Sequence, residues 1–239
     1  MNTLANQPRK LRRTGAIVSG SFPLLDTGYH LTQPEFHRRY ERMPEVKRAE
    51  LIEGVVFLGS PLSNAHSNAT ALVSGWLFTY ASETPGVWPG AKATVILDHD
   101  NEHQPDAHLL IAPDCGGQSN LSEGKYIKGP PELVVEVALS SLAHDLHEKL
   151  AVYRRNGVRE YLVWSLPNSE FHWFNFESGE SESLQPSRGG LLCSRFFPGL
   201  WLDRSAIAGG DLKKVAAAVR RGLASAEHTA FVKKLSAAR

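Results

Sequence analysis

The sequence predicts an α/β (α+β) protein with one main domain and a helical C-terminal extension. Segments with the alternating pattern of strands and segments with helical spacing succeed one another along the 239 residues. Hydrophobic residues make up 42% and charged residues 21%, a composition typical of globular proteins and unlike that of disordered chains or coiled coils. From Asp211 onward the pattern is only helical, which predicts the extension.

The N-terminal stretch and the cysteine content bear on the cellular compartment. The first 25 residues begin with a basic segment, but their apolar part is short and interrupted by glycine and proline, unlike a signal peptide. No apolar run approaches the roughly 20 residues that span a bilayer. Only Cys115 and Cys193 occur, too few for a disulfide scaffold. We therefore expect a cytoplasmic protein that does not cross a membrane.

The first third of the chain predicts two helices with a hairpin between them. Thr32 and Glu35 have the spacing of a capping box with an early proline, so we expect a helix over 33–43 whose polar face is basic. Two short alternating runs on either side of a glutamate–glycine turn predict a hairpin, which places Glu50 on a strand. Apolar residues at helical spacing predict an amphipathic helix over 64–82.

The middle of the chain alternates between strands and helices. We expect strands over 93–97 and 106–111, separated by a polar loop, and a glycine-rich connection over 116–131. The run ELVVEVALS predicts an apolar strand with Glu136 at its centre, followed by a helix over 142–156 that a glycine closes. The remaining strand-like segments are REYLVWS, EFHWFNF and FPGLWLD.

The C-terminal part reads as packing or association rather than chemistry. Apolar residues recur at helical spacing over 212–223, and Ser225 has the position of a cap for a last helix. We expect an N-terminal extension over 1–31, a main domain over 32–203 and a helical extension over 204–239.

Charge is unevenly distributed, although the net charge is only +1. Residues 1–48 hold nine lysines and arginines against four acids, residues 49–136 three against eleven, and residues 137–239 fourteen against ten. An acidic centre between basic flanks is compatible with a metal site inside a surface that binds a polyanion, and also with uneven surface charge on an ordinary protein.

Glu136 is the first candidate for a functional side chain. Its neighbours on both sides are apolar, and an unpaired buried carboxylate would cost several kcal/mol. Glu136 either faces water on the outer side of a half-buried strand or faces a cleft and binds a hard cation such as Mg²⁺.

Lys149 comes into reach of Glu136 if the following helix folds back along the strand. At about 1.5 Å per helical residue and about 3.3 Å per strand residue, both side chains lie roughly 10 Å from the connection. An ammonium beside the carboxylate would orient water or stabilise charge on a phosphate. The alternative is a solvated lysine beside Glu148.

Two further acids are candidates for the same site. Asp106 opens an alternating strand directly after a proline, whereas Asp114 follows a second proline and leads into a glycine-rich loop, so we favour Asp106. Glu50 on the early hairpin is a further candidate, and a surface position is the ordinary alternative for each.

These residues resemble the Uma-two family of restriction endonucleases, within the PD-(D/E)XK nuclease superfamily. The resemblance covers residues 32–164. It is carried in the family's order by AELIEG, by His66 after a Ser-Pro-containing turn, and by QPDAHLLI, PPELVVEVALSS and HDLHEKLAVYRRNGVREYLVW.

The resemblance implies a restriction-endonuclease-like core, with a mixed β-sheet flanked by helices. It further implies that Asp106 and Glu136 bind the metal, with Glu50 at the family's early acidic position, and that Lys149 is the catalytic lysine. Ala138 stands where the superfamily motif has its lysine, and Lys149 on the following helix matches the migrated lysine of this family.

The function expected from this resemblance is hydrolysis of DNA phosphodiester bonds by a Mg²⁺- or Mn²⁺-dependent endonuclease. Because cutting both strands is easiest with two related sites, we also expect a homodimer. Basic residues expected to contact the DNA backbone, or else to lie on solvated helix faces, are Arg38, Arg39, Arg42, Arg154 and Arg155.

Two other functions are compatible with the same sequence. The first is a catalytically inactive nucleic-acid-binding or regulatory module of the same fold. The second is a histidine-based metal hydrolase, for which the candidate ligands would be His99, His103, His108, His144 and His147.

Overall fold

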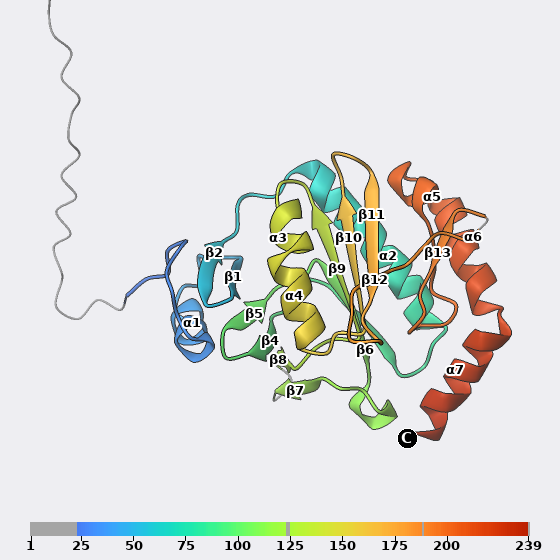
Figure 1. Cartoon of the computed structure of the whole chain (residues 1–239), viewed down its shortest axis with the longest axis horizontal. Coiled ribbons are helices and arrows are strands. Elements are labelled where there is room, and N and C mark those ends of the chain that lie inside the picture. Colours follow the sequence, from blue (N-terminus) through green and yellow to red (C-terminus); the bar gives the residue numbers. More distant parts are fainter. Residues whose placement is uncertain (1–22, 123–124, 188, 239) are drawn as a thin grey trace, which may run out of the picture.

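The computed structural model describes residues 23–122, 125–187 and 189–238 (Figure 1). The predicted N-terminal extension over 1–31 therefore lies largely outside the described residues. The mixed sheet flanked by helices is confirmed, and so are the C-terminal helices. No helix within the described ranges is both long enough and apolar enough to cross a membrane.

The central sheet has six strands in the order β12-β11-β10-β9-β6-β3. The neighbours β9 and β10 are parallel and all other pairs are antiparallel, so the sheet is mixed. Its strands are β3 (Val87–Gly90), β6 (Ala107–Ile111), β9 (Leu133–Ala138), β10 (Glu160–Ser165), β11 (Glu170–Asn175) and β12 (Glu182–Ser183).

A second six-stranded sheet has the order β2-β1-β5-β4-β8-β7. Its strands are β1 (Ala49–Ile52), β2 (Val55–Leu58), β4 (Val95–Asp98), β5 (Asn101–His103), β7 (Asn120–Ser122) and β8 (Tyr126–Lys128). The short strands β13 (Leu191–Cys193) and β14 (Trp201–Asp203) form a separate antiparallel pair.

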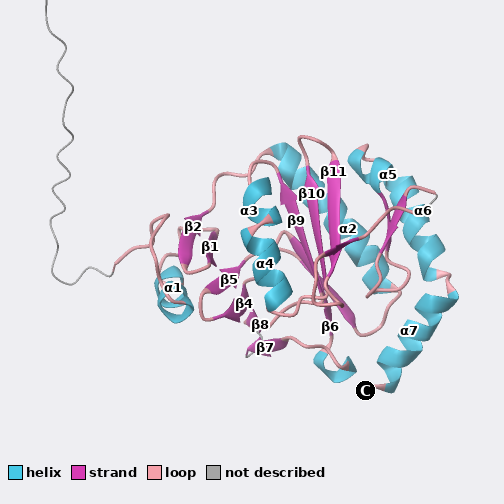
Figure 2. Cartoon of the chain, viewed as in Figure 1, coloured by secondary structure: helices cyan, strands magenta, loops and turns pink. Residues whose placement is uncertain are grey.

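Helices cover both faces of the central sheet (Figure 2). The helices of the described chain are α1 (Gln33–Tyr40), which packs against the second sheet, α2 (Asn64–Ser82), α3 (Leu142–Leu146), α4 (Glu148–Arg155), α5 (Arg204–Ala208), α6 (Leu212–Leu223) and α7 (Ala226–Ala237), with a 3₁₀ turn, η1, at Pro113–Cys115. Buried residues of α5, α6 and α7 belong to the same hydrophobic cluster as those of α2. The predicted domain boundaries stay a prediction.

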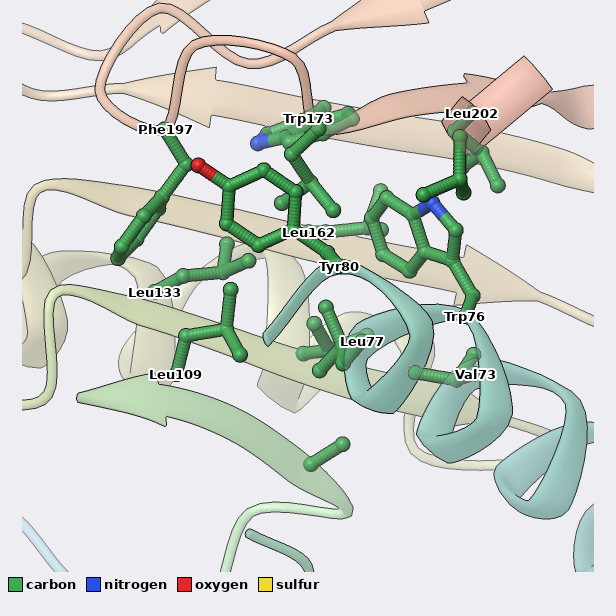
Figure 3. Close-up of a cluster of buried hydrophobic side chains, with 14 of the residues drawn as sticks. Val73, Trp76, Leu77, Tyr80, Leu109, Leu133, Leu162, Trp173, Phe197 and Leu202 are labelled. Carbon is green, nitrogen blue, oxygen red and sulfur yellow. The ribbon is translucent and has the colours of Figure 1, made fainter. Parts of the chain in front are cut away.

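The larger hydrophobic cluster lies between α2 and the central sheet (Figure 3). The ring of Trp76 meets that of Trp173 edge-on, with centroids 5.7 Å apart. The Nε1–H of Trp76 donates a hydrogen bond to the Trp201 carbonyl at 3.0 Å. Leu77 and Leu109 are essentially inaccessible to water. The close packing of α2 fixes the position of its N-terminal turn, which reaches the candidate site.

Strand β9 is buried on both faces, which explains its continuous apolar sequence. Leu133, Val135 and Val137 face α2, whereas Val134 and Ala138 face the side covered by α3 and α4. By this alternation Glu136 faces α3 and α4. The prediction of a strand with Glu136 at its centre is confirmed, and the alternative of a solvent-facing outer side is wrong.

Several expected elements differ from those observed. The expected helix over 142–156 is divided at His147, whose φ and ψ of −120° and −79° depart from those of a regular helix. The nearby Asp145 carbonyl accepts a hydrogen bond from the Tyr161 hydroxyl. The expected polar loop contains β5, whose residues are all buried. The expected glycine-rich connection contains β7 and β8. Strand pairing with distant partners overrides the weak local pattern in both loops.

We expect Leu109→Ala to lower the free energy of unfolding by about 2–5 kcal/mol, because it leaves a cavity where α2 packs on the sheet. Urea denaturation followed by tryptophan fluorescence measures the change. Leu212→Ala is the matched control, since the Leu212 side chain is 63% exposed and its truncation should cost less than about 0.5 kcal/mol. Equal losses in the two variants would contradict this placement of the core.

Candidate active site

Residues from several separate elements meet in one cavity of about 230 Å³. Strand β1 brings Glu50, the residue before β6 is Asp106, β9 brings Glu136, and α4 brings Lys149. The structure thus gathers all four predicted site residues around a common space. Among the residues of the cavity wall that the sequence prediction did not select for the site are Arg48, His66 and Asp145.

Lys149 is the centre of the charged network. Its side chain is buried, and its Nζ lies 2.9 Å from Glu136 Oε1 and 3.1 Å from the Glu50 carboxylate. A third acid, Asp145, lies four residues earlier on the preceding helix, with its Oδ1 3.6 Å from the same Nζ. One ammonium therefore faces three buried carboxylates.

Glu136 is 2% exposed and accepts hydrogen bonds from two side chains. Lys149 donates one, and the Tyr153 hydroxyl donates the other to the same Oε1 at 3.2 Å. Tyr153 lies one helical turn after Lys149, so the same face of α4 provides both donors. This helix is what stabilises a carboxylate in the middle of an apolar strand.

Asp106 is held opposite Glu136 by the antiparallel register of β6 and β9, in which Ala107 pairs with Val135. Its Oδ2 accepts a hydrogen bond from the Val137 N–H at 2.9 Å and lies 3.3 Å from His66 Nε2. Its Oδ1 is buried and has no hydrogen-bond partner within the described part of the chain. Asp114, the competing candidate, is exposed on η1 and is not among the residues lining the cavity.

Glu50 is anchored by its backbone surroundings as well as by charge. The N–H of Gln104 donates to its Oε1 at 2.8 Å, and Arg48 Nη2 lies 3.6 Å from its Oε2. Arg48 also lies 3.8 Å from Asp106 Oδ1 through Nη1. The arginine thus joins Glu50 to Asp106.

The network gives the acids opposite pKa shifts. Burial alone would raise the pKa of Glu50, but Lys149 and Arg48 outweigh burial and hold it well below its usual range. Burial raises the pKa of Glu136 and its effect dominates, since Lys149 opposes it while Asp145, Asp106 and Glu50 reinforce it. One ammonium cannot compensate every carboxylate, so a proton is retained most readily at Glu136.

Two of the residues that the prediction missed have a spacing in the sequence that points to the site. Arg48 precedes Glu50 by two residues, and residues two apart on a strand share a face. Asp145 precedes Lys149 by four residues, the spacing at which side chains on a helix are neighbours. His66 is indicated by the sequence only as one element of the family resemblance, without a role, because the packing of α2 is what brings it to Asp106.

The predicted DNA-binding arginines lie elsewhere, and none of them belongs to the described lining of the cavity. Arg38 and Arg39 both bind Glu35 on their own helix. Arg154 binds Glu180, and Arg155 binds Glu53 and Asp98.

The donor set of the cavity fits a hard divalent cation chemically. Carboxylate oxygens are the ligands that Mg²⁺ prefers, and the buried Asp106 Oδ1 has a lone pair without a donor. Among the described residues, however, no three His, Cys, Asp or Glu side chains are arranged to hold a single ion. In this arrangement the Lys149 ammonium occupies the position between Glu50 and Glu136.

The histidine alternative gains no support from the described part of the chain. His103 is fully buried with its ring 5.1 Å from that of Tyr153, and burial lowers its pKa to about 3. His108 is also buried, and burial lowers its pKa to about 4. Both rings are therefore packed as neutral side chains, and no histidine belongs to a group of described residues that could hold a metal.

Comparisons with known proteins place this geometry in context. The family model Uma2, described as "Putative restriction endonuclease", matches residues 34–205. A crystal structure from Anabaena variabilis, titled as a putative nuclease belonging to DUF820, superposes with a TM-score of 0.52 at 12% sequence identity. The superposition covers 76% of this chain and 97% of that one, which shows a shared fold. No curated protein matches the chain significantly.

We expect Glu136 to contribute a fall in the free energy of unfolding of the metal-free protein as the pH rises from about 4.5 to about 8. Glu136 has an ordinary pKa of 4.5 when unfolded, and burial raises it to about 8 in the folded protein. Its contribution is thus complete below the unfolded pKa and is lost as the pH passes through the folded pKa. Glu136→Gln should remove this contribution, which over the whole pH range is on the order of a few kcal/mol.

Urea denaturation in EDTA across this pH range measures the slope for both proteins. Glu180→Gln is the matched control, because its side chain is 82% exposed and should leave the slope unchanged. A wild-type slope identical to that of Glu136→Gln would show that Glu136 does not retain its proton.

A second prediction concerns the dependence of the acids on Lys149. Lys149→Met leaves Glu136 and Glu50 without their shared cation, so it should lower the free energy of unfolding at neutral pH by about 3–5 kcal/mol. Adding Glu50→Gln should recover part of this loss, since the uncompensated charge of Glu50 is then removed. Double-mutant denaturation in EDTA checks the coupling, and strict additivity within about 0.5 kcal/mol would contradict it.

Proposed function

The chain belongs to the Uma2 family, described as "Putative restriction endonuclease", and from that premise we propose that it is a metal-dependent DNA endonuclease that hydrolyses phosphodiester bonds. The observation that carries the proposal is the convergence of Glu50, Asp106, Glu136 and Lys149 in one cavity. These residues come from positions as far apart as 50 and 149 in the sequence, and an apolar strand carries one of them. Structural stability alone does not require such an arrangement, because well-packed hydrophobic residues replace buried ion pairs at little cost.

In the proposed site, Asp106 and Glu136 would hold Mg²⁺ or Mn²⁺, with Glu50 as the third carboxylate. The chemistry that such an ion supplies when bound is polarisation of a phosphate oxygen and a lowered pKa of water. Asp106 is the acid best prepared for this role, since Val137 and His66 fix one of its oxygens and leave the other without a donor.

Lys149 would orient the attacking water and offset the negative charge that develops on the phosphate. Its ammonium already lies beside the carboxylates, held by contacts with Glu136 and Glu50. Arg48 extends the positive charge on the Asp106 side of the cavity. The five arginines predicted from the sequence are proposed to contribute salt-sensitive contacts with the DNA backbone away from the cavity.

A catalytically inactive DNA-binding module of the same fold is the second candidate function. It is favoured by the contacts of Lys149, which bind the acids to one another. In this second function the charged network would serve only to stabilise the fold. The cytoplasmic location and the homodimer remain predictions under either function.

The test is cleavage of supercoiled plasmid with Mg²⁺ or Mn²⁺. Wild type should cut the plasmid, whereas Asp106→Asn and Lys149→Ala should cut it about 10²–10⁴-fold more slowly, because each loses a group that acts on the reacting phosphate or water. Asp114→Asn is the matched control and should retain wild-type activity, since Asp114 lies outside the cavity.

Circular dichroism and DNA binding are measured on every variant, so that loss of folding is distinguished from loss of chemistry. Manganese binding followed by electron paramagnetic resonance should weaken in Asp106→Asn and persist in Asp114→Asn. If wild type binds DNA and leaves it uncut with either metal, the inactive binding module is the correct function.

A further inference from the structure

We infer that the cavity takes an unpaired DNA nucleotide, whose base packs against the apolar rim formed by Leu62 and Leu139. This inference rests on the proposed DNA cleavage and specifies its substrate as single-stranded DNA or a nucleotide extruded from a duplex.

Part of the cavity wall is formed by two uncharged segments. They are residues 57–63, which begin at the end of β2, and residues 139–141 after β9. The sequence has no lysine, arginine, aspartate or glutamate over 54–82 or over 137–143. A surface that grips the backbone of a duplex presents lysine and arginine next to the scissile phosphate, and these segments have none.

Leucine side chains take the place of those cations. Leu62 is 47% exposed and Leu139 is 42% exposed, and both line the cavity, so they lie where it opens to solvent. They are among the few large apolar side chains that the described chain exposes to this degree. An apolar rim beside a site for a charged phosphate fits a ligand that is itself half apolar, as a nucleotide is once its base leaves the stack.

Aromatic surface is present in the same cavity. The ring centroids of Phe57 and His144 lie 5.2 Å apart at an interplanar angle of 63°, and both residues line the wall. Proteins that bind single strands use such rings to stack bases without reading their sequence. The volume of about 230 Å³ lies below the range of about 300–1,000 Å³ typical of pockets for drug-sized ligands, which suits one base rather than a turn of duplex.

The charged side chains inside the cavity fit a ligand with a single phosphate. The cations in its described wall are Arg48 and Lys149, and both contact the acids. They can meet one phosphate that enters the cavity, but they present no continuous track for a double-stranded backbone. The unpaired nucleotide would thus place its phosphate at the acids and its base at the rim.

The experiment compares three fluorescently labelled DNA substrates of one sequence: a single strand, a blunt duplex, and a duplex with a single extra nucleotide. Binding by fluorescence anisotropy and cleavage in Mn²⁺ are measured for each. Wild type should bind the single strand and the bulged duplex about tenfold more tightly than the blunt duplex, and should cut them faster.

The double variant Leu62→Ala, Leu139→Ala should lose about tenfold in affinity for the single strand and the bulged duplex, while its affinity for the blunt duplex is unchanged. Both side chains are exposed, so the variant is expected to fold, and circular dichroism checks this. Leu212→Ala is the matched control, because it truncates an exposed leucine that does not line the cavity.

The outcomes separate this inference from the proposed function. If wild type cuts DNA but treats the three substrates alike, the inference is overturned and the endonuclease stands. If no substrate is cut, the binding measurements still decide, since a single-strand preference that depends on the two leucines supports the inference without catalysis. Absence of DNA binding, or a preference that survives in the double variant, overturns it.

Discussion

The burial of Lys149 among the carboxylates of Glu50, Glu136 and Asp145 is the constraint on which the rest of the structure depends. Each of these charges would be strongly unfavourable alone in a low-dielectric interior. Together they are tolerable, although three acids exceed one ammonium and the pKa of Glu136 rises as a result. The network therefore keeps charged groups concentrated away from water, in a place where small changes in protonation or ligation have large energetic effects.

The fold provides this network through ordinary packing rules. Strand β9 is buried on both faces, so any polar residue along it must find its partner inside the protein. The antiparallel register with β6 brings Asp106 opposite Glu136, and α4 returns along the same face with Lys149 and Tyr153. Strand β1 of the second sheet closes the cavity with Glu50. Both sheets are therefore needed to complete the site.

The surroundings of the network bear on what it acts upon. Charge is concentrated inside the cavity, while the segments at its mouth carry leucines and serines. Four of the five arginines proposed to bind the DNA backbone are paired with acids, as Arg38 is with Glu35. Such a division between a charged interior and an apolar rim matches a nucleotide that has left the base stack better than it matches an intact duplex.

The sequence by itself determined the alternation of strands and helices and the strand around Glu136. It also determined the helix Asn64–Ser82 and the capped helices near the C-terminus. These elements have strong periodicity or clear caps, which act over a few residues and are legible in one dimension. The motifs also indicated the family, and the resemblance to it indicated the candidate site residues Asp106, Glu136, Lys149 and Glu50.

Only the tertiary structure decided what those residues contact. Strand β5 lies in a segment that is polar in sequence, because its pairing with β1 and β4 outweighs its local composition. The break at His147 and the approach of His66 to Asp106 likewise depend on partners distant in the chain. Burial had the largest effect on the contacts of Glu136 and Lys149. Whether these two side chains are solvated or bind each other depends on how the helices pack on the sheet. That packing is a property of the whole fold rather than of any local pattern.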